Sequence, residues 1–214
     1  FAEMEPAARN NAIDKLASRA LWWFRWAAAA TLLTGLLILV AQVWGPTGNA
    51  SLFTGDYWKS NEGVSIATGI LLAVTMFLNV WLVIWPAQKK VIANARNVQA
   101  GGQADPAAAA AGRASALASR QNTIYSFPML LFMVGTANFF NHYDPSKFTS
   151  GNRGGYFAVT AVIWAVFELN ALGVLGGRAA GKINLWIYEN HWRSIGTGIV
   201  LAGVWYALFQ IFFS

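Results

Sequence analysis

Long apolar stretches alternate with polar segments along the chain, and five of these stretches are about 20 residues long. An α-helix rises 1.5 Å per residue, so roughly 20 residues cross the ~30 Å hydrocarbon core of a bilayer. The two-residue alternation typical of outer-membrane barrel strands is absent. The pattern therefore predicts an all-α, polytopic integral membrane protein. Its five transmembrane helices are expected at residues 26–44, 63–85, 122–140, 156–177 and 194–214.

The two longest polar segments also have helical character. Residues 1–21 are amphipathic, with Ile13 and Leu16 on one face and most of the charged side chains on the other. Such a helix is expected to lie along the cytoplasmic membrane interface, ahead of the first span. The longest connection, residues 86–121, is expected to form two short helical pieces in a cytoplasmic loop, because Gly and Asp-Pro pairs interrupt an Ala-rich sequence. We interpret residues 1–214 as a single membrane domain.

Composition narrows the possible functions. Hydrophobic residues make up 56% of the chain and charged residues only 11%, whereas a soluble domain carries about a quarter charged residues. The chain has no Cys, which excludes disulfides, iron–sulfur clusters and thiolate metal sites. No phosphate-binding loop, nucleophile triad or metal-ligand spacing is present, so the chain by itself is expected to be non-catalytic. The net charge of +6 is typical of basic loops at a membrane and does not indicate nucleic-acid binding.

The basic residues indicate how the chain is oriented. If the N-terminus is cytoplasmic, all 15 Lys and Arg residues except Lys59, Lys147 and Arg153 fall on the cytoplasmic side. Lys and Arg are enriched in the cytoplasmic loops of membrane proteins. We therefore expect a cytoplasmic N-terminus and a C-terminus on the outer side of the membrane.

The two histidines are candidate cofactor ligands. His142 follows the third predicted span and His191 precedes the fifth, so they are expected on opposite sides of the bilayer. They could then not ligate one haem together, although either one alone could hold a haem b or a pigment. The alternative is an interfacial imidazole that binds loop backbone or water.

Glu168 is the only acidic residue well inside a predicted span. An ionisable side chain at that depth is costly and usually has a function. Asn79, Ser126 and Asn170 reach similar depths, so a polar cluster of these four residues is geometrically possible. The cluster is either a proton or quinone site, or a protonated carboxyl group that holds neighbouring helices together by hydrogen bonds.

Three segments carry a family resemblance: residues 79–93 read NVWLVIWPAQKKVIA, residues 102–106 read GQADP, and residues 119–133 read SRQNTIYSFPMLLFM. One span thus ends in a Pro and paired lysines, a short loop with Gly and Asp-Pro follows, and Asn opens the next span. The chain resembles the N-terminal membrane domain of the bacterial membrane-bound, cytochrome c-linked urate oxidases. The resemblance implies a membrane fold in the bacterial inner membrane, where the outer C-terminus expected from the basic residues would be periplasmic.

The sequence departs from this family pattern at the histidines. The family carries a His just before the Asn that opens the third span and another near the far end of that span. The corresponding positions here are Gln121 and Ala137, and no Cys-x-x-Cys-His haem attachment motif is present. We therefore interpret Gln121 and Asn122, at the start of the third span, as the boundary of a helix.

Three functions are compatible with these patterns. The leading hypothesis is a non-catalytic accessory subunit of a multi-subunit redox or energy-converting complex, whose partners are other membrane subunits and lipid. The first alternative is an electron-transfer protein that holds one haem b and passes electrons to a c-type cytochrome. The second alternative is a small transporter that uses Glu168 for proton coupling.

Overall fold

The computed structural model describes residues 3–44 and 55–214, and within these ranges every regular element is helical. The α-helices are α1 (Pro6–Ala12), α2 (Ser18–Trp44), α4 (Asn61–Leu78), α5 (Trp85–Gln99), α6 (Pro106–Asn138), α7 (Ser150–Ala171), α8 (Trp186–Glu189) and α9 (His191–Phe213). Two π-helical segments are η1 (Ile13–Ala17) and η3 (Asn79–Ile84). Short 3₁₀ turns are η2 (Tyr57–Lys59), η4 (Phe140–His142), η5 (Pro145–Lys147) and η6 (Ile183–Leu185). The predicted all-α class is confirmed.

The N-terminal segment differs from the separate interfacial helix expected at residues 1–21. Pro6 occupies the first turn of α1, where its missing N–H costs nothing, and the helix then continues through η1 into α2. The Arg96 side chain on α5 donates a hydrogen bond to the Asp14 carboxylate, which ties η1 to α5. The amphipathic segment is thus an extension of the first predicted span.

A second continuous segment runs from Asn61 to Gln99 and contains α4, η3 and α5. Pro86 has no N–H, and its ring would clash with the carbonyl group four residues earlier in a regular α-helix. The wider π-helical turn of η3 lies directly before this proline. The predicted connection at residues 86–121 is therefore a helical hairpin that extends two spans, and Gly101 turns the chain with a φ of 82°.

The C-terminal end of the fourth predicted span is wrong. We expected a helix to Gly177, but α7 ends at Ala171. Gly173, Gly176 and Gly177 have φ angles of 78°, 104° and 80°, which a right-handed helix cannot contain. These glycines fold the chain back towards η6 and α8.

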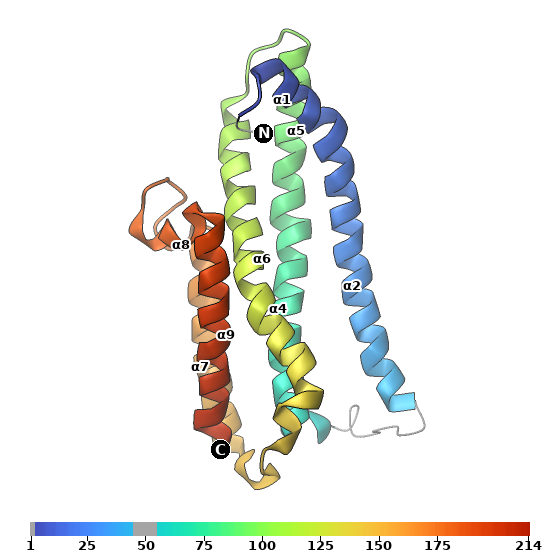
Figure 1. Ribbon diagram of the computed structural model, residues 1–214, viewed down its shortest axis with the longest axis vertical. Helices are drawn as coiled ribbons and strands as arrows, with labels where there is room; N and C mark the ends of the chain where they lie inside the picture. Colours follow the sequence, from blue (N-terminus) through green and yellow to red (C-terminus); the bar gives the residue numbers. More distant parts are fainter. Residues whose placement is uncertain (1–2, 45–54) are drawn as a thin grey trace.

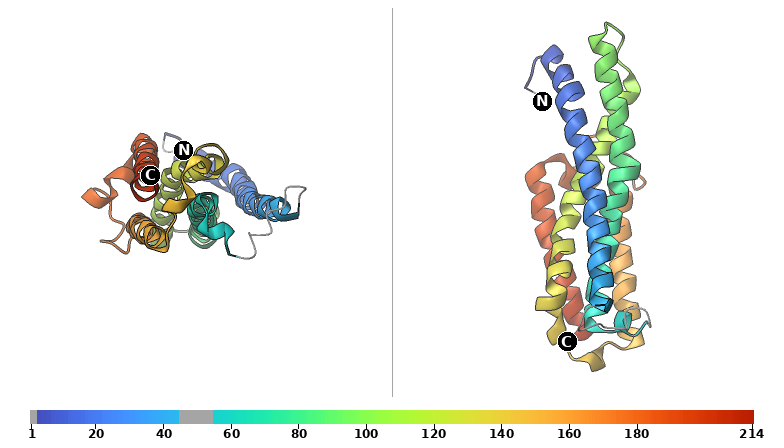
Figure 2. Two further views of the ribbon diagram at one scale, coloured as in Figure 1. Left: turned by 90° about the horizontal axis from the view of Figure 1, so that it is seen from below. Right: turned by 90° about the vertical axis from the view of Figure 1, so that its right-hand side faces the viewer.

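α6 is the central helix of the bundle. α4 packs along one side of it and α9 along another. Figure 2, in the end-on view, shows α2 on one flank and α7 with α9 on the other. Pro128 lies inside α6, and a Cβ atom at Gly198 of α9 would come within 2.9 Å of the Ile124 carbonyl oxygen. Proline removes the hydrogen bond to the carbonyl group four residues earlier, so Gly198 of α9 lies against the α6 carbonyl that Pro128 frees.

Four helical segments of the described chain are long and apolar enough to cross a membrane: Pro6–Ala41, Asn61–Gln99, Ser150–Ala171 and His191–Phe213. The third predicted span, at residues 122–140, lies in α6 and is not among them. α6 is covered by α4, α9 and α7, so it needs less apolar surface than a helix on the outside of the bundle. The structure supports four of the five expected spans by length and composition.

Candidate functional site

Three buried polar side chains from three helical segments meet inside the bundle. We call Asn79, Asn122 and Glu168 the amide–carboxyl cluster. Asn79 is the first residue of η3, Asn122 lies in the middle of α6, and Glu168 lies near the end of α7. The Asn79 side-chain amide donates to the Asn122 carbonyl oxygen at 3.0 Å and to the Glu168 carboxyl group at 3.3 Å. One asparagine therefore joins α6 and α7 through two hydrogen bonds.

Asn122 completes this arrangement. Its own Nδ2 donates to the Met76 backbone carbonyl at 3.0 Å, so both ends of its amide group are engaged with the α4–η3 segment. Asn79 lies at the junction where α4 passes into the π-helical turn, and Met76 lies just before it. The local irregularity imposed ahead of Pro86 therefore coincides with the place where the cluster forms.

A second polar group lies beside the cluster. The Tyr188 hydroxyl donates to Gln121 Oε1 at 2.5 Å and to the Phe167 carbonyl at 3.1 Å, which fixes α8 against α6 and α7. Burial raises the pKa of the Tyr188 phenol, so the hydroxyl stays protonated and acts as a donor. Gln121 Nε2 is buried and has no hydrogen-bond partner among the described residues.

The four residues predicted to form one cluster do not all meet. Asn79 and Glu168 are in contact, as described above. Asn170 instead forms a reciprocal pair with Asn184, each bond 2.7 Å long, and so closes the loop after α7. Ser126 donates to the Thr123 carbonyl of its own helix at 2.8 Å and does not reach the cluster.

Asn122 was not predicted as a member of the cluster. The interpretation of Gln121 and Asn122 as a helix boundary is wrong, because both are buried in the middle of α6, which has 33 residues. The signal that was available is the helical character of residues 86–121. A helical connection would have continued the third span towards its N-terminus and placed these amides inside a helix.

The two histidines are exposed at opposite ends of α9. His191 is the first residue of this 23-residue helix. Near the other end of α9, Phe209 packs on Phe140 with ring centroids 4.4 Å apart, and Phe140 lies in the same 3₁₀ turn as His142. A helix of that length spans roughly 35 Å, so the two imidazoles cannot ligate one haem.

The positions where the resembling family carries histidines do not face a common site either. Gln121 bonds to Tyr188, whereas Ala137 lines the opposite flank of α6, next to α2. Along α6 the two positions are separated by about 24 Å. The described residues therefore do not fit a haem held by two histidines. No group of three or more His, Cys, Asp or Glu side chains capable of holding a metal ion occurs in residues 3–44 and 55–214.

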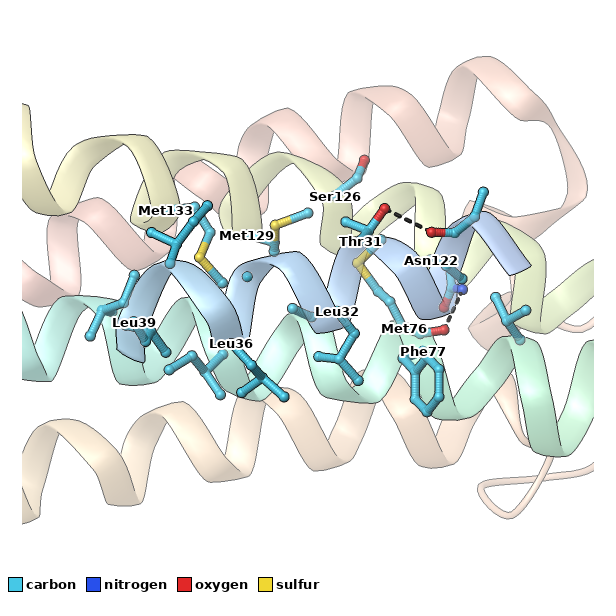
Figure 3. Close-up of a pocket in the computed structure, with 18 of the residues that line it drawn as sticks. Thr31, Leu32, Leu36, Leu39, Met76, Phe77, Asn122, Ser126, Met129 and Met133 are labelled. Atoms are coloured by element: carbon cyan, nitrogen blue, oxygen red, sulfur yellow. Dashed lines mark hydrogen bonds between the residues drawn. The ribbon is translucent and has the colours of Figure 1, made fainter. Parts of the chain in front are cut away.

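A groove of about 780 Å³ lies between α2 on one side and α4 and α6 on the other. Figure 3 shows Leu36, Leu39 and Met133 towards one end and Thr31 with Asn122 towards the other. The Thr31 hydroxyl donates to the Ala27 carbonyl at 2.9 Å, so its proton is used within α2. We call this feature the α2 groove. Its wall is mainly apolar, and Asn122 is the one member of the amide–carboxyl cluster that lines it.

The comparison with known families agrees with the resemblance seen in the sequence. A family model described as urate oxidase N-terminal matches residues 49–170. The chain belongs to the urate oxidase N-terminal family. This predicted relationship is confirmed. No curated protein and no solved structure matches the chain.

The part matched by the urate oxidase N-terminal family contains all three residues of the amide–carboxyl cluster. It ends at residue 170, while α2 and α9 lie outside it. The family region therefore supplies the hydrogen-bonded centre of the bundle, and the two flanking helices add the groove on one side and an aromatic core on the other. Chemically, the cluster can hold helices together or hold a proton at Glu168.

Proposed function

We propose that the chain is a polytopic membrane protein that serves as a non-catalytic accessory subunit of a multi-subunit redox or energy-converting complex in the bacterial inner membrane. The observation that supports this proposal is that the polar groups of the amide–carboxyl cluster are hydrogen-bonded between helices. Asn79, Asn122 and Glu168 are hydrogen-bonded to one another and to backbone, across three helical segments. A carboxyl group engaged in this way connects helices.

The distribution of charge supports the proposed orientation. The α1–η1 segment and the α5–α6 hairpin, which both carry basic residues, lie at one end of the bundle (Figure 1). Lys59, Lys147 and Arg153 belong to segments near the other end, where α9 terminates. Basic segments stay in the cytoplasm, which gives a cytoplasmic N-terminus and a periplasmic C-terminus. Many large apolar side chains of α2, α7 and α9 are exposed, as expected for helices that face lipid.

The experiment compares two substitutions at Glu168. A neutral carboxyl group is close to Gln in shape and can donate a hydrogen bond, so Glu168→Gln should leave assembly and turnover of the host complex nearly unchanged. Glu168→Leu removes the bond to Asn79 and should weaken assembly by about 0.6 kcal/mol, the average for such bonds between membrane helices. Subunit retention and turnover are measured on the complex that copurifies with the tagged chain.

Glu62→Gln is the matched control, because Glu62 lies in the first turn of α4 outside the amide–carboxyl cluster. It should behave as the unmodified chain in both measurements. A proton-transfer function predicts the opposite order at Glu168: the Gln variant assembles but is inactive. That result would replace the scaffold function with proton transfer.

A further inference from the structure

Two hydrogen-bond donors near the N-terminal end of α2 have no acceptor. Within the described ranges, Arg25 Nε and Trp81 Nε1 are buried atoms without a hydrogen-bond partner, and Arg25 belongs to no ion pair. The Arg25 guanidinium carbon lies 5.4, 5.0 and 4.1 Å from the ring centroids of Trp26, Trp81 and Trp85. Stacking on indole rings favours the cation but satisfies none of its N–H groups in the ring plane. The structure therefore leaves a cation and an indole N–H side by side and unpaired.

These two donors lie next to one end of the α2 groove, because Arg25 is one turn before the lining residue Ala28 and Trp81 is one turn after the lining residue Phe77. On α2, Arg25 begins a stripe at helical spacing that continues through groove-lining residues: Ala28, Leu32, Leu36 and Leu39. On the facing segment, Trp81 begins a second stripe of groove-lining residues: Phe77, Ala73, Ile70 and Ile66. Figure 3 shows Leu32, Leu36 and Leu39 along α2 opposite α4. The groove thus has a cationic head and two apolar walls.

Several polar side chains inside the groove already have hydrogen-bond partners. The Thr31 and Ser126 hydroxyls donate to carbonyls of their own helices, and the Asn122 amide is bonded to Met76 and Asn79. A ligand in the groove therefore meets a mainly apolar channel, with the Arg25 guanidinium beside one end. This pattern selects an amphiphile with an anionic head and an apolar tail.

The dimensions agree with one lipid leaflet. From Arg25 to Leu39 the groove follows α2 for about 21 Å, and half of a ~30 Å hydrocarbon core is about 15 Å. The difference leaves room for a headgroup region at the Arg25 end, where Trp22, Trp23 and Trp26 are also exposed. Tryptophan is enriched at this depth of a membrane.

We propose that the α2 groove binds one phospholipid of the cytoplasmic leaflet. Its phosphate pairs with the partly exposed Arg25 guanidinium beside Trp81, and one acyl chain lies between α2 and the α4–α6 pair. A phosphodiester supplies the acceptor oxygens and the negative charge that this cation lacks. The lipid then fills the space that α2 does not fill, and so joins α2 to the bundle. This inference rests on the membrane location proposed above.

The test uses the full chain, purified in detergent, stripped of lipid and then titrated with dioleoyl phosphatidylglycerol. Native mass spectrometry counts the bound lipid, and we expect one copy that binds more tightly than any further copies. Loss of one charge-assisted contact is worth about tenfold in affinity, so Arg25→Gln should weaken this copy by about that factor. Arg193→Gln is the control, because Arg193 also lies over a tryptophan, Trp186, at 4.5 Å but belongs to α9, none of whose residues lines the α2 groove.

A second pair of variants tests the acyl chain. A Cβ atom at Gly35, which lines the groove, meets nothing within 4 Å, so Gly35→Phe should occupy the channel without disturbing α2. We expect loss of the tight lipid copy. Gly203→Phe on α9 is the control, because Gly203 has the same open space outside the groove. Both variants are checked for unchanged helix content by circular dichroism.

Two competing ligands separate the contribution of the phosphate group from that of the acyl chains. Inorganic phosphate that displaces the lipid at similar concentration, together with full binding to the Gly35→Phe variant, would reduce the site to an anion site and overturn the proposal. Dioleoylglycerol that binds as tightly as the phospholipid would remove the role of Arg25 and also overturn it. If Arg25→Gln fails to fold, Arg25→Lys replaces it, and the retained charge should keep binding within a few-fold. Membrane insertion is measured separately by alkaline extraction of cell membranes, so failure of the membrane location is seen independently of lipid affinity.

Discussion

α2 and α9 are both long apolar helices, with 27 and 23 residues, yet they relate to the bundle in different ways. α9 buries Trp205, Phe209 and Phe213 against α6 and its neighbours. In α2, residues 18–41 include none that is buried, and a groove separates this helix from α4 and α6. Apolar length predicts that each helix can cross a membrane, but it does not predict whether the helix packs against its neighbours.

The difference follows from which side chains each helix turns towards the bundle. α9 presents Gly198, which admits the α6 backbone, and then large aromatic residues that fill the space below it. α2 contacts the bundle at only a few places, such as Ala28 and Leu39, and Gly35 leaves open space between them. Many of its large residues are exposed. Association of helices in lipid depends on close packing, because lipid tails are as apolar as the side chains. α9 achieves that packing by itself and α2 does not.

The largest expected effect is truncation of an α9 aromatic residue. Trp205 is fully buried and donates to Thr160 Oγ1 at 3.3 Å, so Trp205→Ala leaves both a cavity and an unpaired hydroxyl. We expect a loss of about 3 kcal/mol in the free energy of unfolding. Leu36→Ala on α2 removes a half-exposed side chain and should cost less than about 0.5 kcal/mol. Unfolding titrations of the two detergent-solubilised variants measure the contrast, and equal losses would show that α2 is packed as closely as α9.

The next largest effect is expected from replacing a glycine on α9, compared with replacing one on α2. A Cβ atom at Gly198 would lie 2.5 Å from the Phe127 ring and 2.9 Å from the Ile124 carbonyl, whereas one at Gly35 meets nothing within 4 Å. Gly198→Leu should therefore push α9 away from α6 and destabilise the protein by about 2 kcal/mol. Gly35→Leu should be neutral or slightly stabilising. Thermal denaturation of both variants decides the point, and a neutral Gly198→Leu would mean that the two helices lie farther apart than described.

The smallest effect is a pH dependence near the start of α9. Arg113 on α6 binds the Glu189 carboxylate with nitrogen–oxygen distances of 2.5 and 3.1 Å. This hydrogen bond from Arg113 lowers the pKa of Glu189 below its ordinary value of about 4.3. The ion pair therefore stabilises the fold fully above that ordinary value, and the stabilisation is lost as the pH falls through the lowered pKa.

The measurement is the denaturation midpoint of the unmodified chain and of Glu189→Gln between pH 7 and pH 3. The unmodified chain should lose slightly more stability than the variant over this interval, since surface ion pairs contribute at most about 1 kcal/mol. Parallel curves would show that the pair does not hold α8 and the start of α9 in place.

The sequence predicted much of the fold and part of the site. The length of the apolar stretches predicted the helical spans, and the depth of Glu168 within its span identified it as a candidate site residue. The same reasoning failed at α7, where three left-handed glycines end the helix early, and at Asn122, which was taken for a boundary residue. Each failure has a local cause. The end of α7 depends on the backbone angles of its glycines, and the position of Asn122 depends on whether the polar connection before it continues the helix.

By itself, the sequence determined which segments are helical and which residues are apolar, because helix formation and hydrophobic length depend on residues near one another in the chain. Only the tertiary structure decided that Asn79 meets Asn122 and Glu168, which lie 43 and 89 positions away. It also decided that α9 packs closely while α2 leaves a groove, and that Arg25 and Trp81 lie together near one end of it. These outcomes depend on the crossing and rotation of neighbouring helices, and several side chains on different helices determine them together.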